Sequence, residues 1–255
     1  MAKLEPVNIE KHKHLKIAAK RDIRHIANQH IVPITAPEFA QGVTTFPIFI
    51  VKDQEANRYR SVAMLGLESG ENLYLTKENV WGGIYAPQTV GMIPFSLGLD
   101  PEKENTLTAC IDVESDLVGE DKELALFDEK GEPTDLFKSV EDSLGRLYNN
   151  EVLTEKFLTE VVELDLLEEI EMTISLVTGE QKKIVGLYTI NEKKLLELSD
   201  EKVIDFHKRG LFIPMHAMLS SVNQVHRLAQ LRNEAEQNVK VTGIKLSPKK
   251  DEEKA

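Results

Sequence analysis

Short runs of hydrophobic residues, separated by polar turns, recur along this chain and predict β-strands. Two such runs, at residues 61–67 and 71–75, flank the turn ESGE. Gly70 can take a positive φ there, so a β-hairpin is expected over residues 61–75. Further strands are expected at residues 46–51, 107–115, 172–177 and 183–190, and residues 124–134 are expected to form a strand, a turn and the lead into a helix.

Hydrophobic residues three and four positions apart predict helices in the second half of the chain. One helix is expected over residues 135–149, ending at an Asn-Asn pair. A second is expected to start at a Thr154 cap and to continue to about residue 169. Shorter helices are expected at 191–198 and 200–208, the latter stopped by Gly210.

The C-terminal region predicts a long helix over residues 214–232. Pro214 suits a first helical position, and a hydrophobic stripe follows it at helical spacing. This stripe is either core or a surface through which two copies of the chain dimerise. Antiparallel hairpins with segregated helices make the expected fold class α+β.

Charge and composition predict three regions along the chain: a basic, partly flexible arm (1–30), a single α+β domain (31–238) and a charged flexible tail (239–255). The arm has seven basic and three acidic residues, whereas residues 151–171 have eight acidic residues and one lysine. These stretches are either solvated surfaces, or the arm docks onto an acidic partner or onto the chain's own acidic helix.

The overall composition excludes several classes of protein. The net charge is −12, which opposes non-specific binding to nucleic acid. No hydrophobic run is long enough to span a bilayer, and no secretion signal is recognised. Cys110 is the only cysteine, which fits a reducing compartment. A cytoplasmic location is therefore expected.

The segment at residues 79–99 is rich in glycine, proline and large hydrophobic residues, and it contains the only tryptophan. Segments of this kind pack over a sheet or form the rim of a pocket. Trp81 and Tyr85 are therefore candidate ligand-binding residues. The alternative is that these aromatic side chains are core.

Three polar residues are further candidates for such a pocket. Asp112 lies in the sequence DVESD, whose alternate acidic side chains would share one face of a strand and could bind a divalent cation or simply face water. Asp128 precedes a turn glycine and fits a plain hairpin turn. His216 lies close to the turn GLFIP and is a candidate polar group or a surface histidine.

The sequence contains no signature that defines a reaction or a cofactor. The GLESG sequence at residues 66–70 lacks the central serine of a hydrolase elbow. No phosphate-binding loop, dinucleotide fingerprint or paired CxxC occurs, and no two histidines have the i, i+4 spacing of a helical metal site. No cofactor and no metal is therefore expected.

Several blocks occur in an order that resembles the SapC family of bacterial proteins associated with surface layers. They are FPIFI, VAMLGLESGENLYL, PFSLG, TACID, ALFDEKGEPT, VGLYTINEKKLLELSDE and LFIPMHAMLSSVNQVHRL. The resemblance covers roughly residues 30–231. It implies a bacterial accessory role and supplies no agreed catalytic residues.

Two hypotheses about function follow. The first is a non-enzymatic cytoplasmic interaction protein of the SapC type that has a protein partner and assists a surface-protein or peptide-handling system. The alternative is an enzyme or small-ligand binder whose pocket lies under residues 79–99, with polarity from Asp112, Asp128 or His216.

Overall fold

The computed structural model describes residues 3–19, 23–100, 106–235 and 239–249. Contacts divide the chain into two compact units, each made of two separate stretches. The first unit comprises residues 1–25 and 88–149, and the second comprises residues 26–87 and 150–255. Both contain helices and antiparallel sheets, so the α+β class predicted from the sequence is confirmed. The turn η1 (Arg24–Ile26) lies at the first passage between them.

The first unit contains two small antiparallel sheets, each with three strands. The order of the larger sheet is β1 (Leu4–Pro6), β7 (Leu107–Asp112) and β6 (Phe95–Leu99). The smaller sheet places β2 (Lys16–Ile17) between β8 (Val118–Gly119) and β9 (Leu124–Ala125). The unit also contains α1 (Ile9–His12), α3 (Gln88–Met92) and the first half of the long helix α4 (Asp135–Glu163).

The core of the first unit forms where α4 packs against these strands. Every third or fourth residue of α4 in this half is buried, as amphipathic spacing predicts. The core consists of Ile17, Phe95, Ala109, Ile111, Leu126, Phe127, Phe137, Val140 and Leu144.

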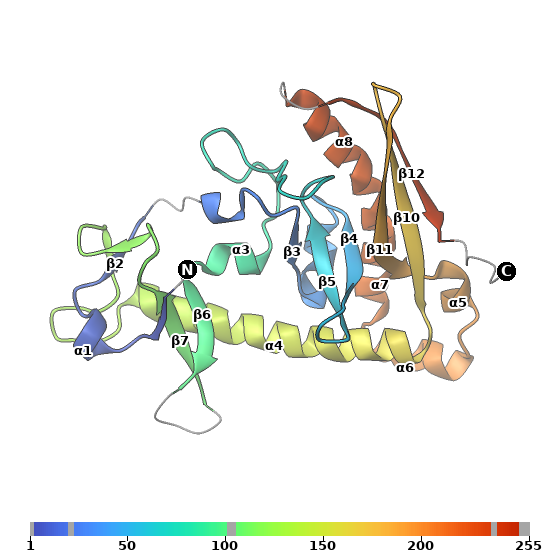
Figure 1. Ribbon diagram of the computed structural model, residues 1–255. Coiled ribbons are helices and arrows are strands. Elements are labelled where there is room, and N and C mark those ends of the chain that lie inside the picture. The colour runs from blue at the N-terminus through green and yellow to red at the C-terminus, as the bar shows by residue number, and fades with distance from the viewer. Residues whose placement is uncertain (1–2, 20–22, 101–105, 236–238, 250–255) are drawn as a thin grey trace. The chain divides into compact units, whose positions relative to one another are not determined.

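The second unit is organised around one antiparallel sheet of six strands (Figure 1). Hydrophobic residues alternate with polar residues along β10, so that one face of this strand is buried. The strand order is β12 (Val241–Pro248), β10 (Leu167–Leu176), β11 (Gln181–Ile190), β4 (Ile48–Asp53), β5 (Arg58–Met64) and β3 (Ile31–Pro33).

The C-terminal helical segment packs on this sheet: α7 contacts β11 and β4, and α8 contacts β12. The hydrophobic stripe predicted for this segment is buried within the unit, including Met215, Met218 and Val225, so it is not a surface for dimerisation. The helices of the unit are η2 (Ala36–Glu38), α2 (Phe39–Gly42), the second half of α4, α5 (Glu192–Leu196), α6 (Asp200–Arg209), α7 (Phe212–Ser221), η3 (Val222–Gln224) and α8 (Val225–Glu234).

The hairpin predicted over residues 61–75 is wrong. Strand β5 pairs with β4 and β3, and residues 71–75 form no strand beyond a single bridge between Leu75 and Trp81. The turn of the real hairpin lies just after Asp53, whose carboxylate accepts hydrogen bonds from the backbone amides of Glu55 and Ala56. A carboxylate that binds its own turn in this way is a local signal for a hairpin.

The two helices predicted around residues 135–169 are in fact one helix, α4, which ends at Glu163. Thr154 is not an N-cap. Its hydroxyl donates to the carbonyl of Asn150 within the helix and accepts a hydrogen bond from the amide of Ala36, which starts η2. Threonine favours an N-cap by type, but here the Thr154 hydroxyl makes a tertiary contact with Ala36 instead.

Two segments expected to be flexible contain regular structure. In the predicted arm, residues 4–17 contribute β1, α1 and β2. In the predicted tail, β12 pairs with β10 from Val241 to Pro248. Few residues of β12 are hydrophobic, so its order depends on backbone pairing with a neighbouring strand, which composition does not reveal.

Arg232 of α8 forms the central ionic contact of the second unit. Its side chain is 5% exposed and donates to Glu71 at 2.8 Å and to Glu68 at 2.7 Å. Its Nε also donates to the carbonyl of Val239. Lys182 of β11 pairs with the same Glu68, and Glu71 accepts the amide of Leu67. One guanidinium thus joins α8, the chain just before β12 and the loop that follows β5.

Replacing Arg232 by leucine leaves two carboxylates without their buried partner, and a broken buried pair typically costs about 3–5 kcal/mol. We expect Arg232→Leu to lower the free energy of unfolding by that order, measured by urea titration followed by circular dichroism. Lys208→Ala, at an exposed position of α6, is the control and should stay within about 0.5 kcal/mol of the parent protein. A loss below about 1 kcal/mol for Arg232→Leu would contradict the assigned role.

Candidate functional site

Residues 73–85 form an irregular loop, here called the aromatic loop, in the second unit. Its turn is closed by backbone hydrogen bonds, from Thr76 to Val80 and from Gly82 to Tyr74. Asn79 occupies the left-handed region with φ 56°, a conformation that asparagine tolerates better than most residues. The loop is therefore closed on itself, although it contains no regular element.

Aromatic side chains attach this loop to the chain segment that precedes β4. Trp81 stacks on Tyr74 with ring centroids 5.4 Å apart, and the Trp81 Nε1 donates to the carbonyl of Tyr85 at 2.9 Å. The Tyr74 hydroxyl donates to the carbonyl of Thr45, and the Tyr85 amide donates to the Thr45 hydroxyl at 3.0 Å. These contacts give the Trp81 indole, the Tyr74 hydroxyl and the Tyr85 amide defined partners and tie the loop to the segment before β4.

A buried carboxylate fixes the end of the aromatic loop. Glu38 is buried and accepts the Tyr85 hydroxyl on one oxygen at 2.7 Å. Its other oxygen accepts the amide and the hydroxyl of Thr35 in a capping box. Burial, together with the hydrogen bond to Glu38, raises the pKa of Tyr85 well above its usual value, and burial also raises the pKa of Tyr74.

A pocket of about 350 Å³ opens between the aromatic loop and the segment of η3 and α8. Its hydrophobic walls come from Leu73, Leu75 and Leu231, and Arg227 is the only charged residue among those that line it. The remaining lining residues are Thr44, Thr45, Tyr74, Thr76, Gly82, Gly83, Ile84 and Gln224.

Two features of the loop shape this pocket. A side chain at Gly83 would lie 2.6 Å from Thr45 and 2.8 Å from Trp81, so only glycine permits the close packing of loop and cluster. The next residue, Ile84, leaves 87% of its surface exposed. The segment thus presents a large hydrophobic side chain to solvent on a backbone that is held in place.

The residues predicted from the sequence fall in different places. Trp81 stacks on Tyr74, and the Tyr85 amide donates to Thr45; Tyr74 and Thr45 both line the pocket. Residues 82–84 line it directly. His216 is exposed on α7 and its Nδ1 lies 2.8 Å from the carbonyl of Phe212. It does not line this pocket. Asp112 and Asp128 belong to the first unit.

Both aspartates have structural partners in turns. Strand β7 ends at Asp112, so the expected face of alternating carboxylates is not formed; Asp112 accepts the amides of Lys3 and Glu114. Asp128 accepts the amides of Lys130 and Glu132, as in a hairpin turn. Within the described residues, no three His, Cys, Asp or Glu side chains are grouped to hold a metal ion.

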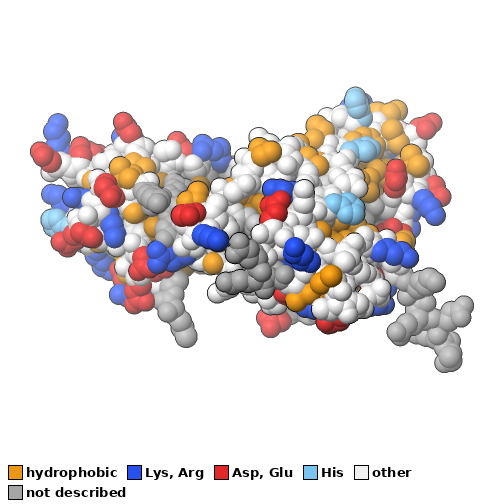
Figure 2. Space-filling view, turned by 90° about the horizontal axis from the view of Figure 1, so that it is seen from above, with side chains coloured by type: hydrophobic (Ala, Val, Ile, Leu, Met, Phe, Trp, Pro, Cys, Tyr) orange, Lys and Arg blue, Asp and Glu red, His pale blue; other side chains and the backbone are white. Residues whose placement is uncertain are grey.

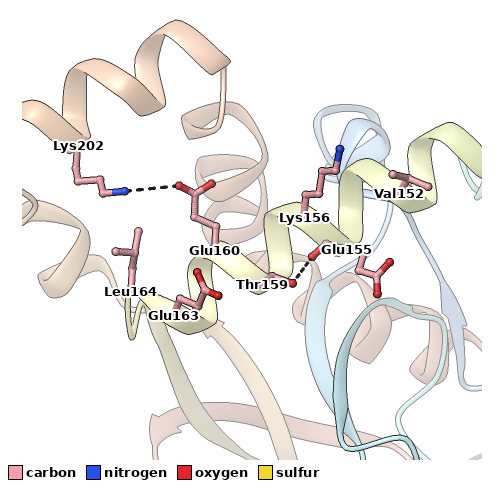
Figure 3. A pocket seen from close by; sticks show the side chains of 8 residues that line it. All are labelled: Val152, Glu155, Lys156, Thr159, Glu160, Glu163, Leu164 and Lys202. Carbon is pink, nitrogen blue, oxygen red and sulfur yellow. Dashed lines mark hydrogen bonds and ion pairs between the residues drawn. The ribbon is translucent and has the colours of Figure 1, made fainter.

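A second pocket, of about 430 Å³, lies along the outer face of the second half of α4 (Figure 3). Glu160 reaches from this face toward Lys202 of α6, 3.9 Å away, and it accepts two hydrogen bonds from Arg209. Arg209 also pairs with Asp205. Glu160 is therefore already paired with cations of the same unit, although the sequence of this stretch is strongly acidic.

Several residues of the aromatic loop's surroundings, in the pocket lining and behind it, were not predicted. The sequence TAPE at residues 35–38 carries the capping-box signal that could have identified Glu38. Gln224 and Arg227 lie between the hydrophobic positions of the predicted helical stripe, and no local signal relates them to the aromatic loop. Only the packing of α8 against that loop brings them together.

Comparison with known protein families identifies a match. A family model described as SapC matches residues 7–228, which is most of the chain and includes the aromatic loop. No curated protein and no solved structure matches the chain. Among the described residues, no helix has the length and hydrophobicity needed to cross a membrane.

The raised pKa values of Tyr74 and Tyr85 predict how stability depends on pH. The unfolded chain releases these protons near the ordinary value of 10.0, whereas the folded chain keeps them, so the free energy of unfolding should fall as the pH rises above that value. Urea unfolding from about pH 8 to about pH 11 measures this slope. Tyr74→Phe should flatten it, and exposed Tyr148→Phe is the control. An unchanged slope in Tyr74→Phe would contradict the prediction.

Proposed function

The chain belongs to the SapC family, and from this premise we propose that it is a non-enzymatic accessory protein that binds a segment of a partner protein at the aromatic-loop pocket. We place it in the cytoplasm, where its single cysteine fits a reducing compartment. Its proposed role is to assist a system that handles surface proteins or peptides.

The observation that carries this proposal is the exposure of the Ile84 side chain. It is 87% exposed beside a pocket, yet its loop is held by the hydrogen bonds of Trp81 and Tyr85. A large hydrophobic side chain on an ordered backbone loses little conformational entropy when a partner covers it. A hydrophobic side chain that becomes fully covered at the centre of an interface can contribute a large share of the binding energy.

The chemistry of the pocket supports binding rather than catalysis. No Asp, Glu, His, Cys or Ser is among the residues that line it. Tyr74 is the one lining side chain with a titratable hydroxyl. Burial raises the pKa of this hydroxyl above its ordinary value, and the hydroxyl already donates to the carbonyl of Thr45. A general acid or base is most effective when its pKa is near the working pH.

Surface charge also favours a protein partner over nucleic acid. Figure 2 shows acidic and basic side chains interspersed over the visible face, with hydrophobic side chains gathered at one end of the view beside histidines. Binding to nucleic acid depends on a concentration of basic side chains, which the described residues visible in Figure 2 do not present.

The second candidate function is binding of a small ligand. The volume of about 350 Å³ is near the lower end of pockets that hold small molecules, roughly 300–1,000 Å³. Thermal-shift screening of the full chain with metabolites tests this candidate. A small molecule whose stabilisation is lost in Trp81→Leu would favour it.

Replacing Ile84 by aspartate should remove the main hydrophobic contact with the partner. We expect Ile84→Asp to weaken binding by about 2 kcal/mol, roughly 30-fold, as for a residue that dominates an interface. The measurement is recovery of the partner with the tagged chain at native expression level in its bacterium, quantified by mass spectrometry.

The matched control is Leu196→Asp, which places the same charge at another exposed hydrophobic position, 81% exposed on α5. It should leave recovery of the partner unchanged. Equal recovery with Ile84→Asp and Leu196→Asp would contradict the proposal, as would a preparation with no stoichiometric partner.

A further inference from the structure

We infer that the pocket selects a partner segment in which a carboxylate side chain lies next to hydrophobic residues, and that Arg227 of α8 binds this carboxylate. This inference rests on the proposed function and states the chemistry of the partner at that site. It commits to an acidic, hydrophobic peptide segment as the occupant.

The first argument is the position of Arg227. It lines the pocket together with Leu231, one helical turn further along α8, and with Leu73 and Leu75 of the facing loop. The aromatic ring of Tyr74 belongs to the same lining. Arg227, whose side chain is 44% exposed, is thus the only charged residue that lines a pocket with hydrophobic walls. A partner segment that covers the pocket would displace water from it, and an ionic contact there would then be stronger than in open water.

The second argument is that the present partners of Arg227 bind it weakly. Glu234 lies 3.6 Å away, and both side chains are exposed, so the pair contributes little. Gln230 accepts a hydrogen bond at 3.2 Å. Both contacts use the Nη1 atom, and a guanidinium offers five N–H donors. Donors therefore remain for a second carboxylate, which a guanidinium can bind with two parallel hydrogen bonds.

The third argument is that Arg227 is the only charged residue among those that line the pocket. The other residues that line the pocket are uncharged, and the side-chain amide of Gln224 donates to the carbonyl of Val43. A lysine or arginine in the partner would meet a like charge in the pocket, which costs binding energy and excludes basic segments. The pocket therefore distinguishes acidic from basic segments.

The test is selection of peptides from a random phage-displayed library on the immobilised full chain. Four proteins are compared: the parent chain, Arg227→Glu, Arg58→Glu and Ile84→Asp. Arg58 is an exposed arginine of β5 outside the pocket, so Arg58→Glu makes the same change of charge elsewhere. The parent chain and Arg58→Glu should select peptides that contain Asp or Glu beside Leu, Ile or Val. Arg227→Glu should select Lys or Arg at the same place.

Affinities of the selected peptides then give the size of the effect. Replacing the acidic residue of a selected peptide by its amide should weaken binding to the parent chain about 10-fold, the usual scale of a hydrogen bond to a charged group. The same replacement should have little effect on binding to Arg227→Gln. This pattern would show that the two groups act on each other.

The failures are distinguishable. If the peptides need Ile84 but the same consensus is selected on the parent chain and on Arg227→Glu, the inference is wrong and the proposed function stands. If the selected peptides bind Ile84→Asp as well as the parent chain, they do not use the pocket and both fall. A selection that enriches no peptide overturns both as well.

Discussion

The buried guanidinium of Arg232 is the contact on which the second unit depends. It binds two carboxylates of the loop after β5 and a carbonyl just before β12, so a single side chain holds segments that are far apart in the sequence. The backbone of that loop turns so closely that a side chain at Gly66 would lie 2.2 Å from the carbonyl oxygen of Glu71. The aromatic loop begins directly after this turn, and Arg227 lies on the helix that carries Arg232. An ion network outside the lining therefore links the helix that carries Arg227 to the chain that leads into the aromatic loop.

The parts of the fold that the sequence predicted well are those determined by local patterns. Strand β11, the second half of β10 and helix α6 follow from alternation, helical spacing and the stop at Gly210, which takes φ 70° as a helix-ending glycine does. The first residues of β10 instead lie within the range predicted for the end of a helix. The errors share one cause, which is a distant partner. Thr154 favours a cap by type, but the amide of Ala36 uses its hydroxyl. Strand β12 has too few hydrophobic residues to be predicted without β10 beside it.

In the candidate site, too, the sequence predicted only what a local pattern determines. Tryptophan, tyrosine and glycine concentrated in one segment indicated the aromatic loop, because this composition is unusual in an exposed connection. The roles within the loop could not be assigned from the sequence: Trp81 and Tyr85 face the body of the unit, while Gly82, Gly83 and Ile84 line the pocket. Which side of an irregular loop faces outward depends on its hydrogen-bond partners, here Thr45 and Glu38, and those precede it by some forty residues.

Each unit is made of two separated stretches, and this has a consequence for the order in which the chain leaves the ribosome. Strand β1 is synthesised early but must wait for β7, its only partner in the described residues. Strands β3, β4 and β5 likewise emerge long before β11, which borders β4 in the finished sheet. Until then the edge of β4 and buried residues such as Phe49 stay open to water and to other chains. The nascent chain therefore passes through a long interval in which it is prone to association, and cutting it at any single point leaves at least one unit incomplete.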